Sequence, residues 1–348
     1  MDENPDIRVS YESLKGNEYF EALHKRMDAG KGDDVFMVNH DIVLELEEEG
    51  KLAELSDLDI IADYTDAMLS QIEDNGDIYW VPTTVSAFGL YCNQNLLRDH
   101  KQEVPENLAQ WEQVCDYFVK EGITPVIANN DISLKTLAIG KGFYSVYQED
   151  SQREVFAQLN EGKEMLSKYL YPGFSLAEDF IGKGYVSAAD TLETNKTSDD
   201  LDKFVKGDSP FMLTGAWAAG RVKSMEPGFE FEVVPYPVLE DGSLLVINAD
   251  TRLSVNADSE HMAASLKFVE YFTRPDNVQK FADQQSSFNP LNKWKPFFCP
   301  GNPTAGFLLP VRKNCDRDRR PVGTSHMGIG TKEGFSQTAF GRETGFCD

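Results

Sequence analysis

The chain has 348 residues, 41% of them hydrophobic, and a formal net charge of −25. This length is typical of two domains, and the strong negative charge excludes the basic face that a nucleic-acid partner needs. No apolar run approaches the roughly 18–20 residues that a membrane helix requires, so we expect neither a membrane span nor a nucleic-acid partner.

Strands and helices alternate along the first two thirds of the chain. Strands are predicted where apolar and polar residues alternate, or where short apolar runs stop at turn residues. They are expected at 6–11, 33–38, 77–82 (ended by Pro82), 87–93, 124–131 (continuing into a loop), 229–237 and 243–257. Helices are predicted by apolar residues three or four apart, at 17–29, 41–54, 106–121 and 261–275. The alternation predicts α/β layers with largely parallel sheets.

In an open sheet of this kind, ligands bind beyond the carboxyl ends of the strands. That rule points to five loops, at residues 38–41, 82–86, 128–131, 214–217 and 248–251. Eight of the polar and aromatic side chains in these loops are the candidate ligand-binding residues, namely Asn39, His40, Asp41, Ser86, Asn130, Asp131, Trp217 and Asp250. Flat apolar faces beside a few fixed polar groups suit a sugar, which has an apolar C–H face and a ring of hydroxyls.

Trp217 is the most informative of these residues. It is one of four tryptophans, and it stands among the glycine and alanine residues of the stretch 215–220. A large ring in a core needs bulky neighbours to fill the space around it. Small neighbours therefore predict that one indole face stays open to a ligand, with core packing as the alternative. For Trp80, inside a predicted strand, core packing is the stronger interpretation.

The sequence contains no metal or catalytic pattern. None of the five cysteines forms a CxxC pair or stands at ligand spacing from a histidine, so we predict no metal and no cofactor. Cys115 lies on the apolar face of a predicted helix, which indicates a buried, inert thiol. Nucleophile-elbow, phosphate-loop and zinc-protease motifs do not occur, so we expect no enzyme. A glycosidase needs two carboxylates, but among 58 Asp and Glu residues some pair can always be chosen, so this feature does not indicate a glycosidase.

The chain changes in character near Lys293. From there it is rich in Gly, Pro, Arg and Phe, and it has neither a helical nor a strand period. It is also net positive, with nine Lys and Arg against five Asp and Glu. A consistent fold seldom changes its statistics so abruptly. We expect residues 289–348 to be an atypical tail, arising from a frameshift or disordered, with a genuine small appendage as a third alternative.

Seven stretches follow one another in an order and spacing that belong to a known family. They are NPDIRV (4–9), GKGDDVFMVNHD (30–41), GKLAELSDL (50–58), DIYWVPTTVSAFGLYCNQNLL (77–97), PENLAQWEQVCDYFVKEGITPV (105–126), GDSPFMLTGAW (207–217) and the segment 243–290. Together they resemble the extracellular solute-binding proteins of bacterial ABC importers, specifically the carbohydrate-binding family that includes maltose-binding protein. The resemblance spans about residues 4–291.

The resemblance implies two α/β lobes, joined by hinge strands, that close on a ligand between them. Lobe I would comprise residues 1–93 plus 239–288, and lobe II residues 94–238. The protein would be a monomeric receptor that binds a sugar and delivers it to an ABC permease. It would be extracellular or periplasmic, and anchored as a lipoprotein in its full-length form. Sugar contacts would come from the 38–41 loop and from Ser86, and Trp217 would stack on a ring.

The sequence departs from the family pattern at both ends. It begins inside the pattern, without the usual first strand and lipoprotein signal, and the expected C-terminal helices are unrecognisable beyond Pro290. Two alternatives for the function stay open. One is the same fold binding an amino acid or a polyamine, with Arg221, Arg252, Asp41, Asp131 and Asp250 as the charged residues to consider. The other is a truncated, inactive gene product.

Overall fold

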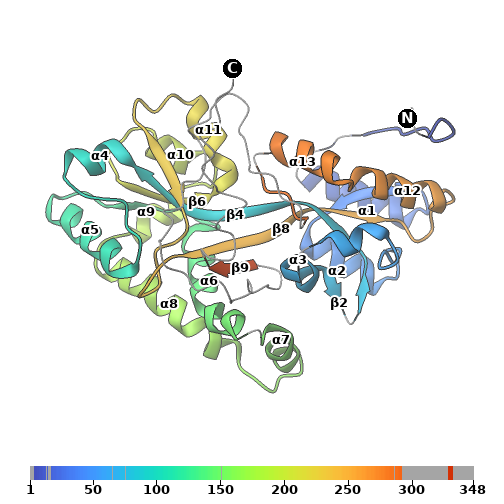
Figure 1. Ribbon diagram of the computed structural model, residues 1–348, viewed down its shortest axis with the longest axis horizontal. Helices are drawn as coiled ribbons and strands as arrows, with labels where there is room; N and C mark the ends of the chain where they lie inside the picture. Colours follow the sequence, from blue (N-terminus) through green and yellow to red (C-terminus); the bar gives the residue numbers. More distant parts are fainter. Residues whose placement is uncertain are drawn as a thin grey trace.

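The computed structural model describes residues 4–12, 14, 17–64, 66–74, 76–149, 151–285, 287–291 and 328–331. Figure 1 shows two groups of helices at opposite ends of two long strands, β4 (Val81–Asn93) and β8 (Leu244–Val255). Lobe I, as we call the first group, has helices α1 (Asn17–Asp28), α2 (His40–Glu48), α3 (Asp66–Ile72), α12 (Met262–Phe272) and α13 (Pro275–Gln284). Lobe II has α4 (Gln94–Asp99), α5 (Leu108–Lys120), α6 (Ser133–Gln148), α7 (Gln152–Asn160), α8 (Leu166–Gly182), α9 (Ala188–Glu193), α10 (Asp199–Phe204) and α11 (Ala219–Ser224).

One curled sheet runs through both lobes in the order β1-β8-β4-β6-β5, with β7 beside β4 and β9 beside β8. The remaining strands are β1 (Val35–Val38), β5 (Val126–Ile127), β6 (Phe211–Gly215), β7 (Phe231–Val234), β9 (Gly328–Thr331) and the separate hairpin β2 (Glu73–Asp74) and β3 (Asp77–Ile78). Among the described strand pairs, β5 and β6 alone are parallel. The expectation of largely parallel sheets is therefore wrong. β4 and β8 run in opposite directions between the lobes, and β1, β6, β7 and β9 each pair antiparallel with one of them.

Strand β4 merges two segments that the sequence pattern separates at Pro82. All its residues are buried, and Pro82 stays in the strand opposite Arg252. A proline removes one backbone donor, but its carbonyl still accepts, here from the hydroxyl of Tyr64 at 2.7 Å. The expected end of the strand at Pro82 is thus wrong. The predicted loops at 82–86 and 248–251 are likewise interior segments of β4 and β8.

Side-chain alternation along β4 and β8 divides the hydrophobic core into two clusters. Odd positions such as Val85 and Ala249 belong to a cluster that fills lobe I and continues under α10 and α11 of lobe II. Even positions such as Phe88 and Val246 belong to the cluster that fills lobe II. Farther along this even-numbered face, toward lobe I, the residues become polar, starting with Ser86 on β4. Buried and half-buried polar side chains therefore replace the apolar core where the strands pass between the lobes.

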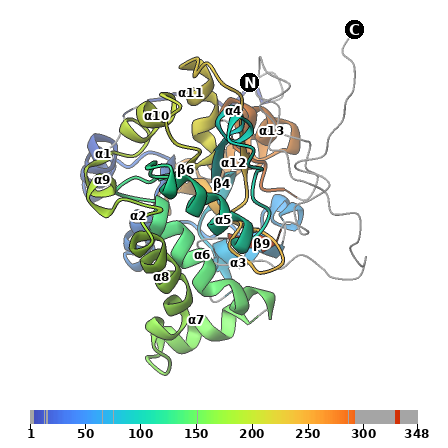
Figure 2. The ribbon, with the colours of Figure 1, turned by 90° about the vertical axis from the view of Figure 1, so that its left-hand side faces the viewer.

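Helices α6 and α8 lie side by side in lobe II, as Figures 1 and 2 both show. Glycines allow this close approach. A methyl group at Gly173 of α8 would overlap the carbonyl oxygen of Ala138, and one at Gly142 of α6 would lie 2.6 Å from the carbonyl oxygen of Tyr169. Pairs of glycines that bring two backbones together leave no room for larger residues, so these positions determine the helix spacing.

The helices predicted at 17–29, 41–54, 106–121 and 261–275 correspond to α1, α2, α5 and α12, although α2 already ends at Glu48. The chain turns there through Gly50, which has a φ of +66°. The strand predicted at 6–11 is wrong, because none of the described strands pairs with this segment and Tyr11 is 84% exposed. Cys115 is buried as predicted, and burial raises the pKa of its thiol.

The last continuous described segment, 287–291, packs against the middle of β4. Phe288 exchanges both backbone hydrogen bonds with Val85, at 2.8 and 2.9 Å, and Leu291 is 1% exposed. The predicted tail 289–348 otherwise lies outside the described residues, except for β9. Among the helices that the structure describes, none is both long and apolar enough to cross a membrane.

Candidate functional site

Two strands point their carboxyl ends at the same region from opposite lobes. β1 ends at Val38, opposite Arg252 of β8, and β6 ends at Gly215, opposite Phe88 of β4. We call this region, residues 82–88 of β4 and 246–252 of β8, the junction. The loops that follow β1 and β6 were predicted to hold ligand, and the sheet places both beside the junction.

Ser86 and Asp250 meet at the junction. Ser86 lies opposite Asn248 in the strand register, and its hydroxyl donates diagonally to Oδ2 of Asp250, with 2.5 Å between the oxygens. The backbone N–H of Thr251 donates to Oδ1 at 2.8 Å. Each oxygen of this half-buried carboxylate thus accepts one hydrogen bond and keeps a lone pair free. The structure brings together two of the predicted residues and fixes the orientation of the carboxylate.

Thr251 interrupts the regular ladder between β4 and β8. It has a φ of +47°, in the left-handed region that β-branched residues avoid. Its carbonyl accepts from the Thr83 hydroxyl and its own hydroxyl accepts from Thr84, both at 2.9 Å. Strain of this kind costs roughly 1–3 kcal/mol and gathers at functional sites. The conformation separates Asp250 from Arg252 and holds both at the junction.

Arg252 is a residue that the sequence reasoning did not place in the sugar site. Its Cζ lies 4.8 Å from the ring centroid of Trp80, and the residue is only 6% exposed. Burial lowers the pKa of the guanidinium, and the carboxylates of Asp250 and Asp41 oppose this shift. The Nε atom has no hydrogen-bond partner. The available signal was a basic residue followed by an apolar one near the end of a predicted strand, where a buried charge needs a partner.

The loop after β1 has fewer contacts with the junction than β4 and β8 have with each other. Asn39 caps α2, and its Oδ1 accepts from the backbone N–H of Ile42 at 2.9 Å. Asp41 is exposed, and its charge reaches Arg252. His40 begins the helix, and its side chain lies outside what the structure describes. Asn39 is therefore partly accounted for by capping, and Asp41 is the residue of this loop that is linked to the junction.

Asn130 and Asp131 lie after β5, at the same sheet edge as the end of β6, because these two strands are parallel. Asn130 is exposed. The carboxylate of Asp131 binds the ammonium groups of Lys196 and, at 3.0 Å, of Lys135. The hydrogen bond from Lys196, partly offset by burial, lowers the pKa of this carboxyl. Asp131 is thus engaged within lobe II.

Trp217 follows β6 in a short 3-10 turn and is half-buried. Its ring folds back over Gly215, where a methyl group would overlap it. Phe88 packs edge-on against the indole, with 5.2 Å between the ring centroids. The small residue at 215 therefore makes room for the indole itself. Trp217 packs against both core clusters, and both clusters contain residues of lobe II.

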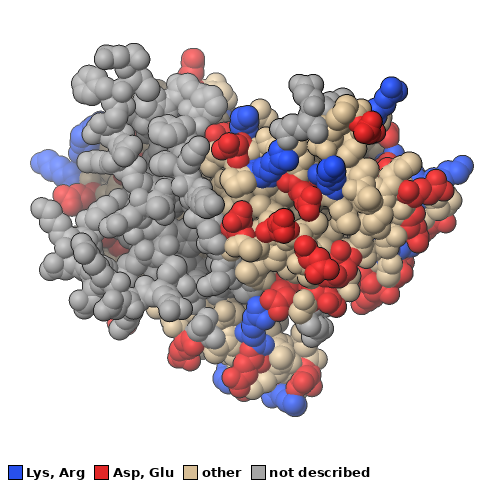
Figure 3. Space-filling model, turned by 45° about the vertical axis from the view of Figure 1, so that its right-hand side comes forward, with Lys and Arg blue, Asp and Glu red and all other residues tan. Residues whose placement is uncertain are grey.

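The three acids that could have formed a polyamine site do not form a free acidic cluster. Asp131 is bound to two lysines, and Asp250 accepts from Ser86 and Thr251. Within the described ranges, no group of three His, Cys, Asp or Glu side chains could hold a metal ion. On the lobe I face in Figure 3, carboxylates are spread widely with basic side chains among them, so the described residues there form no basic patch.

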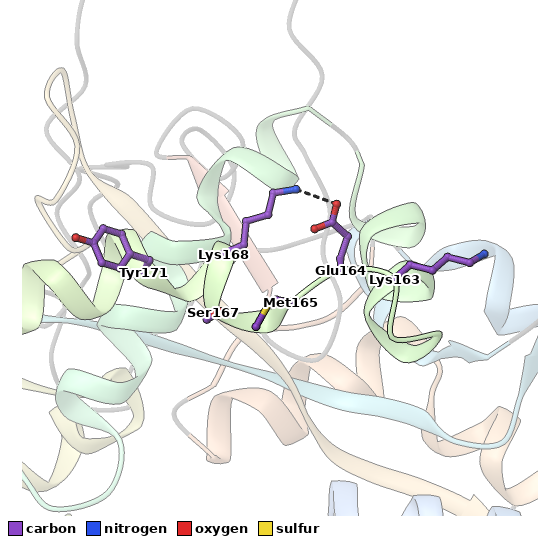
Figure 4. A pocket seen from close by; sticks show the side chains of 6 residues that line it. All are labelled: Lys163, Glu164, Met165, Ser167, Lys168 and Tyr171. Carbon is purple, nitrogen blue, oxygen red and sulfur yellow. Dashed lines mark hydrogen bonds and ion pairs between the residues drawn. The ribbon is translucent and has the colours of Figure 1, made fainter.

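A shallow surface pocket lies elsewhere, where α7 leads into α8. It is lined by Lys163, Glu164, Met165, Ser167, Lys168 and Tyr171 (Figure 4). Lys168 and Glu164 pair with each other at 3.0 Å, and Met165 and Tyr171 are each 73% exposed. None of the predicted site residues lines it. A ligand here would remain largely in solvent, so the junction is the better candidate site.

Comparison with known proteins gives relatives that bind sugars. The chain is 24% identical over 225 residues to the multiple sugar-binding protein of Streptococcus mutans, covering 61% of this chain and 51% of that protein. It is 26% identical over 297 residues to the maltotriose-binding protein of Pyrococcus abyssi, covering 80% and 58%. The chain thus spans little more than half the length of these curated relatives.

Solved structures share the fold. RafE from Streptococcus pneumoniae, in its apo form, matches with a TM-score of 0.67 at 22% identity, covering 84% of this chain and 76% of that one. RafE in complex with raffinose matches with a TM-score of 0.63 at 24% identity, covering 84% and 77%. These neighbours support the predicted two-lobed α/β fold. The family model described as bacterial extracellular solute-binding protein matches residues 1–294. This chain therefore belongs to the family of bacterial extracellular solute-binding proteins.

Proposed function

We propose that this chain is a receptor that binds a carbohydrate at the junction and delivers it to the permease of an ABC importer. The observation that carries the proposal is the Ser86–Asp250 pair, which stands beside the stacked guanidinium of Arg252 where β4 and β8 join the lobes. Sugar hydroxyls donate to a carboxylate and accept from a guanidinium, so this set suits a polyol. The sugar-binding names of the relatives support the same ligand class.

Binding would be coupled to a movement of the lobes. A ligand that contacts residues of both lobes gains its full set of contacts only when the lobes close on it, and so shifts the population to the closed state. β4 and β8 would bend as the hinge, with the lobe boundaries at 1–93 plus 239–288 and 94–238. Trp217, Asn39, Asp41, Asn130 and Asp131 would then complete the site from the two sides.

The receptor would act without catalysis, as a monomer outside the cytoplasmic membrane, and a full-length form would be held there by a lipid anchor. The family is one of extracellular proteins, which supports this location. The permease would recognise the closed form, because only that form presents both lobes in a fixed relative orientation. A polyamine is disfavoured as ligand, since the guanidinium of Arg252 would repel it and Asp131 is already bound to two lysines.

A thermal-shift screen tests the function directly. The ligand-free chain is heated with glucose, raffinose, maltotriose, spermidine or arginine. Ligand at 100 times its Kd adds about 2.7 kcal/mol to the free energy of unfolding, and this raises the Tm by a readily measured amount. The proposal expects an increase with at least one saccharide. An increase with spermidine or arginine and none with any saccharide would overturn it in favour of a non-sugar solute.

A further inference from the structure

Three polar residues occupy alternate positions of β8 on the junction face. They are Asn248, Asp250 and Arg252, and Ala249 between the first two is buried in the core. Alternate residues of a strand point to the same side of the sheet. The face that carries Val246 in the lobe II core therefore continues as a row of amide, carboxylate and guanidinium.

The two ends of this row have unused hydrogen-bonding atoms. Oδ1 of Asn248 and Nε of Arg252 are both buried and have no hydrogen-bond partner. Arg252 is more than nine-tenths buried, and its nearest aromatic neighbour, Trp80, accepts no conventional hydrogen bond. Buried polar groups are normally satisfied, and the hydroxyl of Ser254, two residues farther along the same face, is also buried without a partner. Asn248 and Arg252 flank the carboxylate of Asp250, so their unused atoms indicate a place kept for a ligand.

The charges around the row define the ligand further. The carboxylates of Asp250 and Asp41 act electrostatically on the buried Arg252 and offset part of its positive charge. An anionic ligand would meet these two carboxylates, and a cation would meet the guanidinium. Asn248 and Arg252 are four residues apart, which is about 13 Å along a strand. That distance is longer than one pyranose ring.

We propose that Asn248, Asp250 and Arg252 form a hydrogen-bonding ladder that binds an uncharged saccharide of more than one ring. The proposal rests on the carbohydrate-binding function proposed above. Arg252 donates to hydroxyl or ring oxygens at one end, Asp250 accepts from hydroxyls in the middle, and Asn248 accepts and donates at the other end. Trp80 holds the guanidinium flat and fixes the direction of its donors.

Calorimetric titration of the purified chain tests the ladder, with maltotriose and raffinose as neutral trisaccharide probes and glucose as the single-ring probe. Arg252→Met and Asn248→Ala should each weaken trisaccharide binding at least tenfold. Arg252→Lys keeps a positive charge and should therefore bind more tightly than Arg252→Met and more weakly than the wild type. The Tm of ligand-free Arg252→Met should change little, because methionine still covers Trp80 and the lost attraction to Asp250 and Asp41 is offset by the removal of a buried charge. The matched control is Arg26→Met, since Arg26 pairs with Glu12 at 2.6 Å and Asp33 at 2.9 Å inside lobe I. That control should lower the Tm and leave sugar affinity unchanged.

The outcomes separate this proposal from the function on which it rests. If the wild type binds a trisaccharide but both variants bind it within twofold of wild type, the ladder is wrong and the receptor function stands. Glucose binding as tight as trisaccharide binding would overturn the requirement for more than one ring. If Arg252→Met fails to fold, Asn248→Ala alone decides the question. A wild type that binds no saccharide overturns both proposals.

Discussion

The indole ring of Trp217 folds back onto Gly215, the last residue of β6, so closely that a methyl group at position 215 would overlap it. Phe88 closes the edge of the same ring from β4. The glycine before this tryptophan is thus required by the packing of the ring. The remaining part of the half-buried indole is what a sugar could contact at the junction.

Replacing Trp217 by alanine should abolish saccharide binding and lower the free energy of unfolding only in part. Removal of a fully buried tryptophan costs roughly 3–5 kcal/mol, and a half-buried ring should cost less. Urea unfolding and calorimetric titration measure the two effects. Gly215→Ala should weaken binding too, because it displaces the ring. A Trp217→Ala variant that is unfolded, or that still binds sugar tightly, would mean that the ring serves the core.

Ser86→Ala should weaken saccharide binding and leave the fold intact. The variant removes the hydrogen bond that orients Oδ2 of Asp250, and a hydrogen bond to a charged group contributes about 1.5–3 kcal/mol. Ser243→Ala is the matched control, because Ser243 is equally buried and its hydroxyl donates outside the junction, to the carbonyl of Glu106 at 2.9 Å. Equal affinity for sugar in both variants would exclude a role for the Ser86–Asp250 pair in binding.

Gly173→Ala should destabilise lobe II. The added methyl group would overlap the backbone of Ala138, so α8 must move away from α6, at a cost of roughly 1–3 kcal/mol. Gly182→Ala provides a control in the same helix, because nothing lies within 4 Å of the position. There the change should be neutral or stabilising by up to about 1 kcal/mol. Urea midpoints that shift equally in the two variants would contradict the close packing of these helices.

Asp200 should make the protein more stable as the pH falls. Burial raises the pKa of this carboxyl, although hydrogen bonds from Asn129 (2.8 Å) and from the backbone N–H of Leu201 (2.9 Å) oppose the shift. The folded state therefore binds the proton more tightly than the unfolded state, whose Asp pKa is about 3.9. Stability contributed by protonation is present below that value and is lost as pH rises through the higher folded pKa.

Asp200→Asn removes this titration and should flatten the dependence of Tm on pH above about pH 4. Asparagine is close in size and can still accept a hydrogen bond, which limits the change in packing. Glu232 and Asp33, whose pKa values burial also raises, are left in place and contribute to the residual slope. If the difference in Tm between wild type and Asp200→Asn is the same at every pH, Asp200 does not titrate as described.

Part of the architecture could be predicted because it depends on local periodicity. Apolar residues at a spacing of three to four give α1, α5 and α12 whatever surrounds them, since any partner must cover the same face. Strand direction has no such local signal. The pattern around Pro82 is the same whether a strand ends there or continues opposite Arg252, and the partner strand β8 decides between them.

Among the candidate site residues, those with a local signal were predicted, and those that depend on packing were not. Ser86 and Asp250 were both proposed, and the β4–β8 register brings them together. Arg252 was considered only as a partner for an amino-acid ligand. Its significance depends on its burial over Trp80 and on its unsatisfied Nε, and both are properties of packing.

The sequence by itself determined the family, the two-lobed α/β class and the polar and aromatic residues from which a sugar site could be built. Motif order and side-chain chemistry are properties of the chain that can be read directly. Only the tertiary structure decided that β4 and β8 cross between the lobes in opposite directions, and that their even-numbered face turns from core to polar at the junction. Strand pairing joins residues such as Ser86 and Asp250 that are 164 positions apart. Local patterns contain no information about such a distant partner.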